Sequence, residues 1–480
     1  MQENELMRDD QVPAELGVAA AAAAIRDGDL TAESYATALL RNARRYADLH
    51  SFITVDESAV LAAAEDADKA RAAGASAPLL GVPLGVKDSY TTRGLRTTLG
   101  VKTLETHTPA EDADVVAALK NAGGIVFGKN NLVEMSFGLT GDNKRFGQVK
   151  NPYGRDHVPG GSSSGAGASV AARIVPAALG GDTVGSIRVP AALSGVVGFK
   201  PTTGRWPGRG IAPISPTLDT PGVLARNVED CALIDRIVTG NAAAPPADRT
   251  DLKGARFAYA PRQYLSLIDP AVEAQFTLTL QRLRDAGAEV AEIDLGEDFS
   301  ALADRLTWNL FFRETRQAVS EFLHQNDFPV SFDEIHRELK PQLKETWSQL
   351  VLPSGPGHLS REAYETTLSV DRPELQRRLG EVFTHRGFDA LLFPTTPCTA
   401  PLIDHRSFTI AGAEVGELIL AKNTVPTSGA GLPGISIPMG LAGNGLPTGL
   451  EIDGAHGQDS RLLDLARRVE AILGKLPAPA

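Results

Sequence analysis

The chain has 480 residues, 42% of them hydrophobic, and a formal net charge of −12 at pH 7. This length and apolar content allow a large buried core, in one oversized domain or in two or three smaller ones. The negative charge and the scattered lysines and arginines would repel a phosphate backbone, so we expect no nucleic-acid partner.

The N-terminus and the cysteines bear on location and on metal binding. The first ten residues contain acids and no apolar run, and no window approaches the roughly 18–20 apolar residues that a membrane helix needs. We therefore expect no membrane attachment and a cytoplasmic location. Cys231 and Cys398 lie far apart and outside any CxxC pair. This predicts no disulfide framework, and we expect neither a metal nor a cofactor.

The first part of the chain alternates helical and strand-like patterns. Residues 14–74 have helical spacing after a capping Thr31 and predict two or three helices. The apolar sequence PLLGVPLGVK predicts a buried strand that ends at Lys87. Residues 112–121 predict a helix and residues 125–129 the next strand. This alternation is typical of an α/β architecture.

The second part of the chain predicts a loop, a cap and a return to the sheet. Residues 199–225 are dense in proline and glycine and predict a long ordered loop over one sheet edge. Residues 269–377 have mainly helical patterns, typical of an inserted cap, and strand-like runs return at FDALLFPTTP and LPGISIPMG. Within one large domain we expect N-terminal helices (1–75), a core with the candidate catalytic residues (76–240), a mainly helical cap (241–380) and a C-terminal part completing the sheet (381–480).

A glycine-serine stretch over residues 151–195 contains Ser162, Ser163 and Ser164 in succession and Ser186 further on. GGSSSGAG lacks the lysine of a P-loop and the third glycine of a dinucleotide loop, so both hypotheses fail. GSSSG matches the nucleophile elbow GxSxG, which would make Ser163 the nucleophile of an α/β-hydrolase, but polar residues stand where the elbow needs a strand. A glycine turn before a serine-capped helix is the structural alternative.

Three sites in chain order favour another interpretation: Lys87 at a strand end, Ser162 after paired glycines, and Ser186 in GGDTVGSIRVP. With these motifs the chain resembles the amidase signature family from about residue 14 onward, most specifically between residues 151 and 203. The resemblance implies an α/β fold with a central mixed, twisted sheet, helices on both sides and a helical cap. It also implies a triad in which Ser186 is the nucleophile, Ser162 relays the proton after a cis peptide bond, and Lys87 is the base.

The resemblance also assigns supporting roles. The oxyanion hole would be formed by the backbone amides of Thr183, Val184, Gly185 and Ser186, and a supporting network by Ser163, Asp182 and Arg188. Two positions depart from the family pattern, because Ser164 and Val184 replace glycines. A β-branched residue restricts the backbone, but Val184 still supplies an N–H, so we expect an oxyanion hole of altered shape.

The environment of the base and the pocket can also be predicted. The apolar strand before Lys87 should bury its amine and lower the pKa, while Asp88 should point to the opposite face. We expect pocket-lining residues in EMSFGLT, with core packing as the alternative: Met135, Phe137 and Leu139. Arg209, on a proline-glycine loop, is expected to gate the site or contact substrate, with a solvated role as the alternative.

The motifs GKNNLVEMSFGLT, KNPY, FKPTTGRWPG and GIAPISPTLDT most resemble the family's stand-alone aryl-alkyl amidases, of the indoleacetamide and mandelamide hydrolase type, and its urethanases. This implies a monomeric or homodimeric hydrolase that cleaves small neutral amides with water, namely aryl amides and anilides, with carbamates as a further class. Two alternatives stay open. One is an A-type amidotransferase subunit that supplies ammonia to a partner, and the other is a non-catalytic amide-binding protein.

Overall fold

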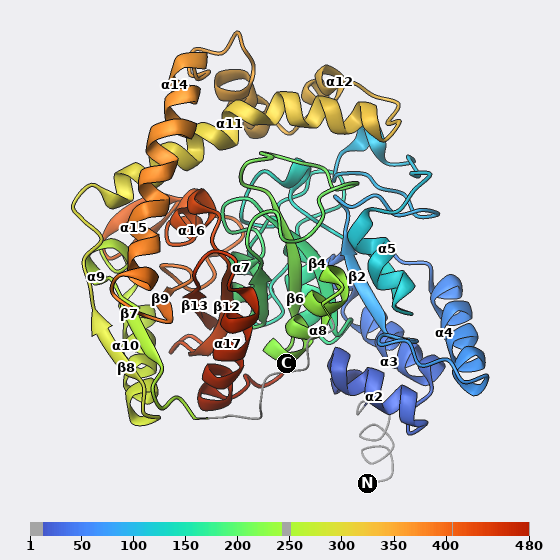
Figure 1. Cartoon of the computed structure of the whole chain (residues 1–480). Coiled ribbons are helices and arrows are strands. Elements are labelled where there is room, and N and C mark those ends of the chain that lie inside the picture. Colours follow the sequence, from blue (N-terminus) through green and yellow to red (C-terminus); the bar gives the residue numbers. More distant parts are fainter. Residues whose placement is uncertain (1–12, 242–250, 406, 480) are drawn as a thin grey trace.

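A mixed sheet of 11 strands forms the centre of the molecule (Figure 1). The computed structural model describes residues 13–241, 251–405 and 407–479. Across the sheet the strands are β1 (Phe52–Thr54), β3 (Ile125–Asn130), β2 (Pro83–Lys87), β4 (Ala177–Asp182), β6 (Thr220–Ala225), β5 (Val197–Lys200), β12 (Gly434–Leu441), β13 (Pro447–Asp453), β9 (Ala390–Pro394), β7 (Arg256–Tyr259) and β8 (Glu289–Glu292). β10 (Ser407–Ile410) and β11 (Ala413–Gly416) form a separate hairpin.

The pairing of the strands is parallel toward the two sides of this sheet and antiparallel in its middle. β2 runs parallel to β3 and β4, and β7 runs parallel to β8 and β9. The strands from β4 to β9 pair antiparallel, as β1 does with β3 at one edge. The prediction of a mixed sheet is therefore confirmed.

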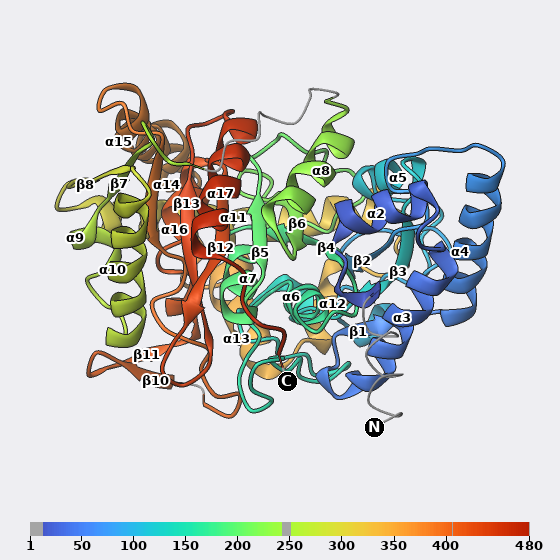
Figure 2. The ribbon, with the colours of Figure 1, turned by 90° about the horizontal axis from the view of Figure 1, so that it is seen from below.

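Helices cover both faces of the sheet and form a cap at one end of it (Figure 1). They are α2 (Val18–Asp27), α3 (Ala32–Arg45), α4 (Glu57–Ala72), α5 (Asp114–Asn121), α6 (Ser164–Ala171), α7 (Arg188–Ser194), α8 (Val228–Thr239), α9 (Pro261–Tyr264), α10 (Pro270–Asp285), α11 (Phe299–Gln325), α12 (Phe332–Glu338), α13 (Pro341–Thr346), α14 (Arg361–Thr366), α15 (Arg372–Thr384), α16 (Val425–Ala430) and α17 (Asp459–Leu473). α6 and α7 pack together on one face, and α8 and α17 on the other (Figure 2).

The N-terminal and strand predictions agree with the structure. The helical pattern of residues 14–74 forms α2, α3 and α4, and Thr31 caps α3 by accepting the N–H of Ser34. β2 ends at Lys87 and all of its residues are buried, as its continuous apolar sequence predicted. The C-terminal segment returns to the sheet as β9, β12 and β13.

The prediction of a loop over residues 199–225 is wrong at both ends of this range. β5 includes residues 197–200 and β6 includes residues 220–225, and both strands lie buried in the middle of the sheet. Glycine serves close packing here rather than a turn, because a Cβ on Gly222 would lie 2.3 Å from the carbonyl oxygen of Phe199. Only the part between the two strands is a loop.

The segment 241–380, predicted as a cap, is also part of the sheet. β7 and β8 extend the sheet at one edge, and α10 connects them, since parallel neighbours need a crossover connection. The cap proper consists of α11, α12, α13 and α14, and α11 and α12 lie across one end of the sheet (Figure 1).

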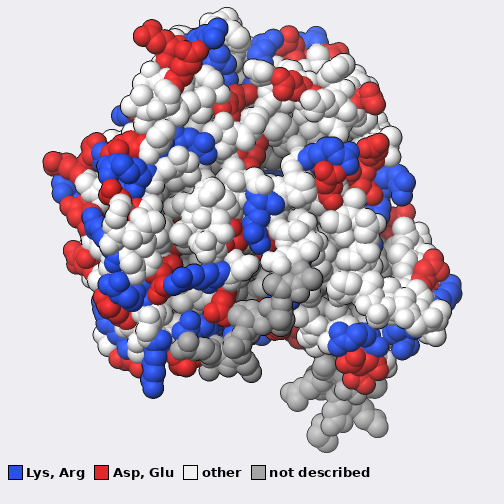
Figure 3. Space-filling model, in the orientation of Figure 1, with Lys and Arg blue, Asp and Glu red and all other residues white. Residues whose placement is uncertain are grey.

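The surface in view is mixed in charge. Figure 3 shows acidic and basic side chains interspersed over one face of the molecule. Within residues 13–241, 251–405 and 407–479, no helix has both the length and the apolar character needed to cross a membrane. Over the same ranges, no group of three or more histidine, cysteine, aspartate or glutamate side chains could hold a metal ion.

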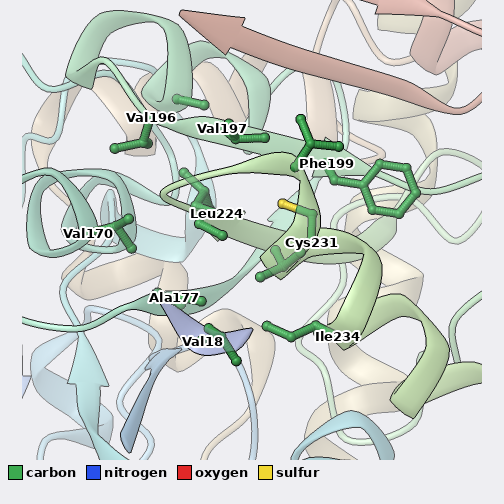
Figure 4. Packing of buried hydrophobic residues seen from close by; sticks show 14 of the residues in the cluster. Val18, Val170, Ala177, Val196, Val197, Phe199, Leu224, Cys231 and Ile234 are labelled. Atoms are coloured by element: carbon green, nitrogen blue, oxygen red, sulfur yellow. The ribbon is translucent and has the colours of Figure 1, made fainter. Parts of the chain in front are cut away.

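The core beside α8 makes a testable contribution to stability. Phe199 of β5 lies beside Cys231 of α8 (Figure 4), and Phe199 is fully buried. Phe199→Ala should lower the free energy of unfolding by about 3–5 kcal/mol, because it removes a buried ring and leaves a cavity.

Urea denaturation of the wild type and of the variant gives the two free energies of unfolding, and their difference measures this loss. The matched control is Leu278→Ala on α10, whose side chain is 55% exposed and should contribute less than about 0.5 kcal/mol. Equal effects of the two substitutions would contradict this view of the core.

Candidate active site

A cavity of about 440 Å³ lies where the carboxyl ends of β2 and β4 face the cap. Most of its lining comes from three regions of the fold. The sheet end and its neighbours contribute Lys87, Ser162, Gly181, Asp182 and Thr183; the loop between β5 and β6 contributes Arg209, Ile211, Ala212, Pro213, Ile214, Pro216 and Asp219; and α11 contributes Ala318, Glu321, Phe322 and Gln325. Strand ends of this kind are common ligand sites in α/β sheets.

A buried amine and a serine hydroxyl meet at this cavity. Lys87 Nζ donates a hydrogen bond of 2.8 Å to Ser162 Oγ, and both side chains are buried. The peptide bond between Gly161 and Ser162 is cis. Burial lowers the pKa of Lys87 to about 7, although the charges of Asp182 and Asp219 oppose this shift. The amine can therefore lose its proton near neutral pH.

Asp88 points away from this amine, as strand alternation predicted. Its Oδ1 lies 3.1 Å from Nζ of Lys129, in a fully buried ion pair. The same carboxylate accepts the backbone N–H of Thr98 at 2.9 Å. Asp88 thus neutralises a second buried lysine and leaves Lys87 without a directly bonded carboxylate.

Ser186 lies on the segment between β4 and α7, with three free backbone amides. In the described ranges, neither its hydroxyl nor the N–H groups of Val184, Gly185 and Ser186 have a hydrogen-bond partner. Unpaired, consecutive N–H groups are what a developing oxyanion requires. The Ser162 hydroxyl is bonded to Lys87 but not to Ser186.

Thr424 holds residues 183–186 from the side of α16. Its Oγ1 donates to the carbonyl oxygen of Val184 at 2.6 Å. The side chain of Val184 is buried in an apolar cluster, and its backbone stays outside the left-handed region. Gly185 has φ +146°, and a Cβ there would lie 2.3 Å from Thr424 Oγ1. Glycine is therefore required at position 185, whereas position 184 accommodates valine.

Asp182 and Arg188 brace the start of α7. Arg188 Nη2 lies 3.0 Å from Asp182 Oδ1, and its Nη1 lies 3.1 Å from Glu451 Oε1. Asp182 also accepts the N–H of Ile187 at 3.1 Å. Burial alone would raise the pKa of Asp182, but the Arg188 guanidinium holds that pKa below its usual range. The ionised carboxylate thus fixes the segment that carries Ser186.

Ser163 connects the two serine-bearing segments. Its N–H donates to the carbonyl oxygen of Ser186 at 3.2 Å, and its hydroxyl contacts the backbone of Gly181 at 3.3 Å. The residues 151–163 that precede α6 form no strand, so the strand-turn-helix geometry of a nucleophile elbow is absent there. The elbow hypothesis for Ser163 therefore has no structural support.

The predicted apolar pocket residues lie in the core instead. Met135, Phe137 and Leu139 belong to a buried cluster and do not line the cavity described above. The ring of Phe137 packs edge-on against Phe311 and Trp347, at centroid distances of 4.9 and 5.1 Å. These partners come from the segment 241–380, so the alternative of core packing is the correct one.

Arg209 does lie in the cavity wall. Its side chain is 61% exposed and pairs with Glu111, at 3.0 Å, and with Asp114. The guanidinium is therefore already engaged by two carboxylates at the rim.

Most of the cavity lining was not predicted from sequence, and Ser136 and Asp219 are two polar examples. Ser136 lines it with φ +62°, a backbone conformation that sequence does not reveal for a serine. Asp219 lines it from the end of the β5–β6 loop, and its Oδ1 accepts from Thr183 Oγ1 at 2.7 Å. Asp219 stands in GIAPISPTLDT, a motif that carried the family resemblance but that gave this acid no role of its own.

Comparison with known proteins agrees with this geometry. Residues 35–463 match the amidase family model, and the chain belongs to the amidase family. It is 37% identical to mandelamide hydrolase of Pseudomonas putida over 97% of this chain and 93% of that protein. It is 34% identical to indoleacetamide hydrolase of Allorhizobium ampelinum, over 82% of this chain and 85% of that protein.

An amidotransferase relative and a solved structure complete the comparison. The A-type subunit of glutamyl-tRNA(Gln) amidotransferase from Roseiflexus sp. is 35% identical over 92% of this chain and 93% of that protein. A solved amidase structure has a TM-score of 0.84 and 30% identity, and the match covers 96% of this chain and 100% of that one. The expected amidase fold is therefore confirmed.

The lowered pKa of Lys87 can be tested directly. In protein labelled with 13C at lysine Cε, the signal of Lys87 should titrate with a midpoint near pH 7, well below exposed lysines, because burial disfavours the ammonium. Lys87→Met keeps the length of the side chain and identifies the signal by its loss. A midpoint near the ordinary lysine value of about 10.4 would contradict the assignment of a neutral amine.

Proposed function

We propose that the protein is a serine hydrolase that cleaves the C–N bond of small neutral amides through an acyl-enzyme on Ser186. The observation that carries this proposal is the buried 2.8 Å contact between Lys87 and Ser162 at the cavity. A lysine whose pKa is near neutrality can accept a proton, and Ser162 can pass one on. Membership of the amidase family supports the same reaction class.

In the proposed acylation, Ser186 Oγ attacks the amide carbonyl carbon and its proton moves to Ser162 Oγ. The proton of Ser162 moves at the same time to the neutral amine of Lys87. The oxyanion receives hydrogen bonds from the free amides of residues 184–186, each worth about 3 kcal/mol in other enzymes. The C–N bond then breaks as Lys87, through Ser162, returns a proton to the leaving nitrogen. Water hydrolyses the acyl-enzyme through the same relay.

The lining of the cavity favours neutral, apolar substrates. Ile211, Ile214 and Phe322 offer apolar contacts for an aryl group, and Glu111, Asp219 and Glu321 add carboxylates around it. Besides Lys87, the cation in the described lining is Arg209, which already pairs with Glu111 and Asp114. Aryl amides and anilides fit this chemistry, and a substrate carboxylate would meet repulsion.

Carbamates are included in the proposed range because they also present a planar carbonyl bonded to nitrogen. Attack by Ser186 would release the amine and leave a carbonate ester on the serine. Water would convert this ester to the alcohol and carbon dioxide, so the same relay and oxyanion amides serve both substrate classes.

An amidotransferase A-type subunit is the second candidate, favoured by the 35% identity to such a subunit. Purified protein alone should hydrolyse mandelamide, indoleacetamide, acetanilide-type anilides or phenyl carbamates. It should be inactive on glutamine, because the described lining offers no unpaired cation to bind the α-carboxylate of that substrate. Glutamine turnover that appears only with partner subunits would favour the second candidate. Binding of amides without turnover would favour an amide-binding protein.

The proposed nucleophile makes a distinct prediction for serine variants. Ser186→Ala and Lys87→Ala should each lower kcat by about 10⁴-fold or more, because nucleophile and base act as one unit. The matched control is Ser163→Ala, which removes a hydroxyl one residue from Ser162 and should cost less. Wild-type turnover by Ser186→Ala, measured with the best amide of the panel, would refute the assignment.

The rate of acylation should depend on pH with a defined sign. Protonated Lys87 cannot accept the proton, so kcat/KM should fall about tenfold for each pH unit below about 7 and level off above it. Burst kinetics with a chromogenic anilide between about pH 5 and 9 measure this limb. A flat profile over this range would argue against Lys87 as the base.

A further inference from the structure

Asp219 occupies a position between the cavity wall and the oxyanion segment (residues 183–186), and the reaction described above gives it no role. Its half-buried carboxylate accepts from Thr183 Oγ1 at 2.7 Å with one oxygen. The other oxygen accepts the N–H groups of Ile214 and Ser215 at 2.8 and 3.0 Å. One side chain thus ties the wall loop to the first residue of the segment that carries Ser186.

A second carboxylate holds the same loop from the cap. Glu314 of α11 accepts the hydroxyl of Thr217 at 2.6 Å and the hydroxyl of Tyr364 at 2.8 Å. It also accepts the hydroxyl of Ser215, whose N–H is bonded to Asp219. The loop therefore lies between two carboxylates, and Asp219 is the one on the side of the oxyanion segment.

Asp219 and Lys87 both line the cavity, and the charge of Asp219 acts on the Lys87 amine. Two carboxylates act on Lys87, namely Asp182 and Asp219. Arg188 binds Asp182, whereas Asp219 has no cationic partner within 4.0 Å in the described part of the chain. Burial raises the pKa of Asp219 to about 7, and the charge of Glu314 adds to this effect. The negative charge of Asp219 therefore favours the protonated form of Lys87.

We propose that Asp219 is a positioning residue for the reaction. Through Thr183 it holds the oxyanion amides in place, and from the cavity wall its negative charge stabilises the proton that Lys87 takes up when Ser186 attacks. This inference rests on the proposed function, in which Lys87 is the base. It predicts two separable effects of Asp219, one on the rate and one on the pKa of the lysine.

Two substitutions separate these effects. Asp219→Asn keeps the size of the side chain but removes its charge and an acceptor, so kcat should fall about 10–100-fold through misplacement of the oxyanion segment. Because the opposing charge is gone, the midpoint of the Lys87 signal and the acid limb of kcat/KM should both move to lower pH. Thr183→Val removes only the hydroxyl, so it should lower kcat and leave the Lys87 midpoint unchanged.

The control for net charge is Glu273→Gln on α10, an exposed carboxylate outside the cavity lining. It should change neither kcat nor the Lys87 midpoint. The inference is wrong if Asp219→Asn retains wild-type kcat and an unmoved Lys87 midpoint in a protein whose Ser186→Ala variant is inactive. If the wild type cleaves no amide or carbamate, the proposed function fails instead, and the Lys87 midpoint in Asp219→Asn still decides whether the two charges are coupled. Should Asp219→Asn not fold, an unchanged kcat in Thr183→Val refutes the positioning role.

Discussion

The burial of one amine is the constraint on which the candidate site depends. Lys87 contacts Ser162, 75 residues away, only because β2 is buried within the sheet and α6 begins beside its carboxyl end. Removal from water disfavours the ammonium and brings its pKa near 7. A solvated lysine at the same distance would remain protonated at neutral pH and could not act as a base.

A second requirement is that the free amides beside Ser186 stay in place without hydrogen bonds of their own. The surrounding structure meets it by bonding the neighbouring groups instead. Asp182 binds Arg188 and the N–H of Ile187, and Thr424 binds the carbonyl of Val184. The backbone of position 184 lies outside the left-handed region, so it accommodates valine where the family pattern has glycine. In the proposed reaction this position supplies an N–H, and valine provides it.

Sequence patterns predicted those elements whose signals are local. β2 was evident from a continuous apolar run, α3 from its cap, and the returning C-terminal strands from their apolar residues. Local signals gave the wrong element where tertiary packing, rather than residue type, decides the conformation. Proline and glycine in residues 199–225 indicated a loop, yet β6 is a buried central strand in which Gly222 permits close contact with β5. β8 was not predicted, because it is an edge strand with a glutamate at each end and therefore has no continuous apolar run.

The chemical groups and their order can be read from the sequence: a lysine at the end of an apolar strand, serines after paired glycines, and a short segment able to present free amides. Which side chains line the cavity depends on the folded arrangement of distant segments. Phe137 and Phe322 are equally apolar in sequence, but Phe137 packs against Trp347 in the core, whereas Phe322 of α11 faces the cavity. Asp219 likewise reaches the site only through the fold. The physical reason is that burial, charge coupling and cavity lining arise between segments distant along the chain, where local periodicity carries no information.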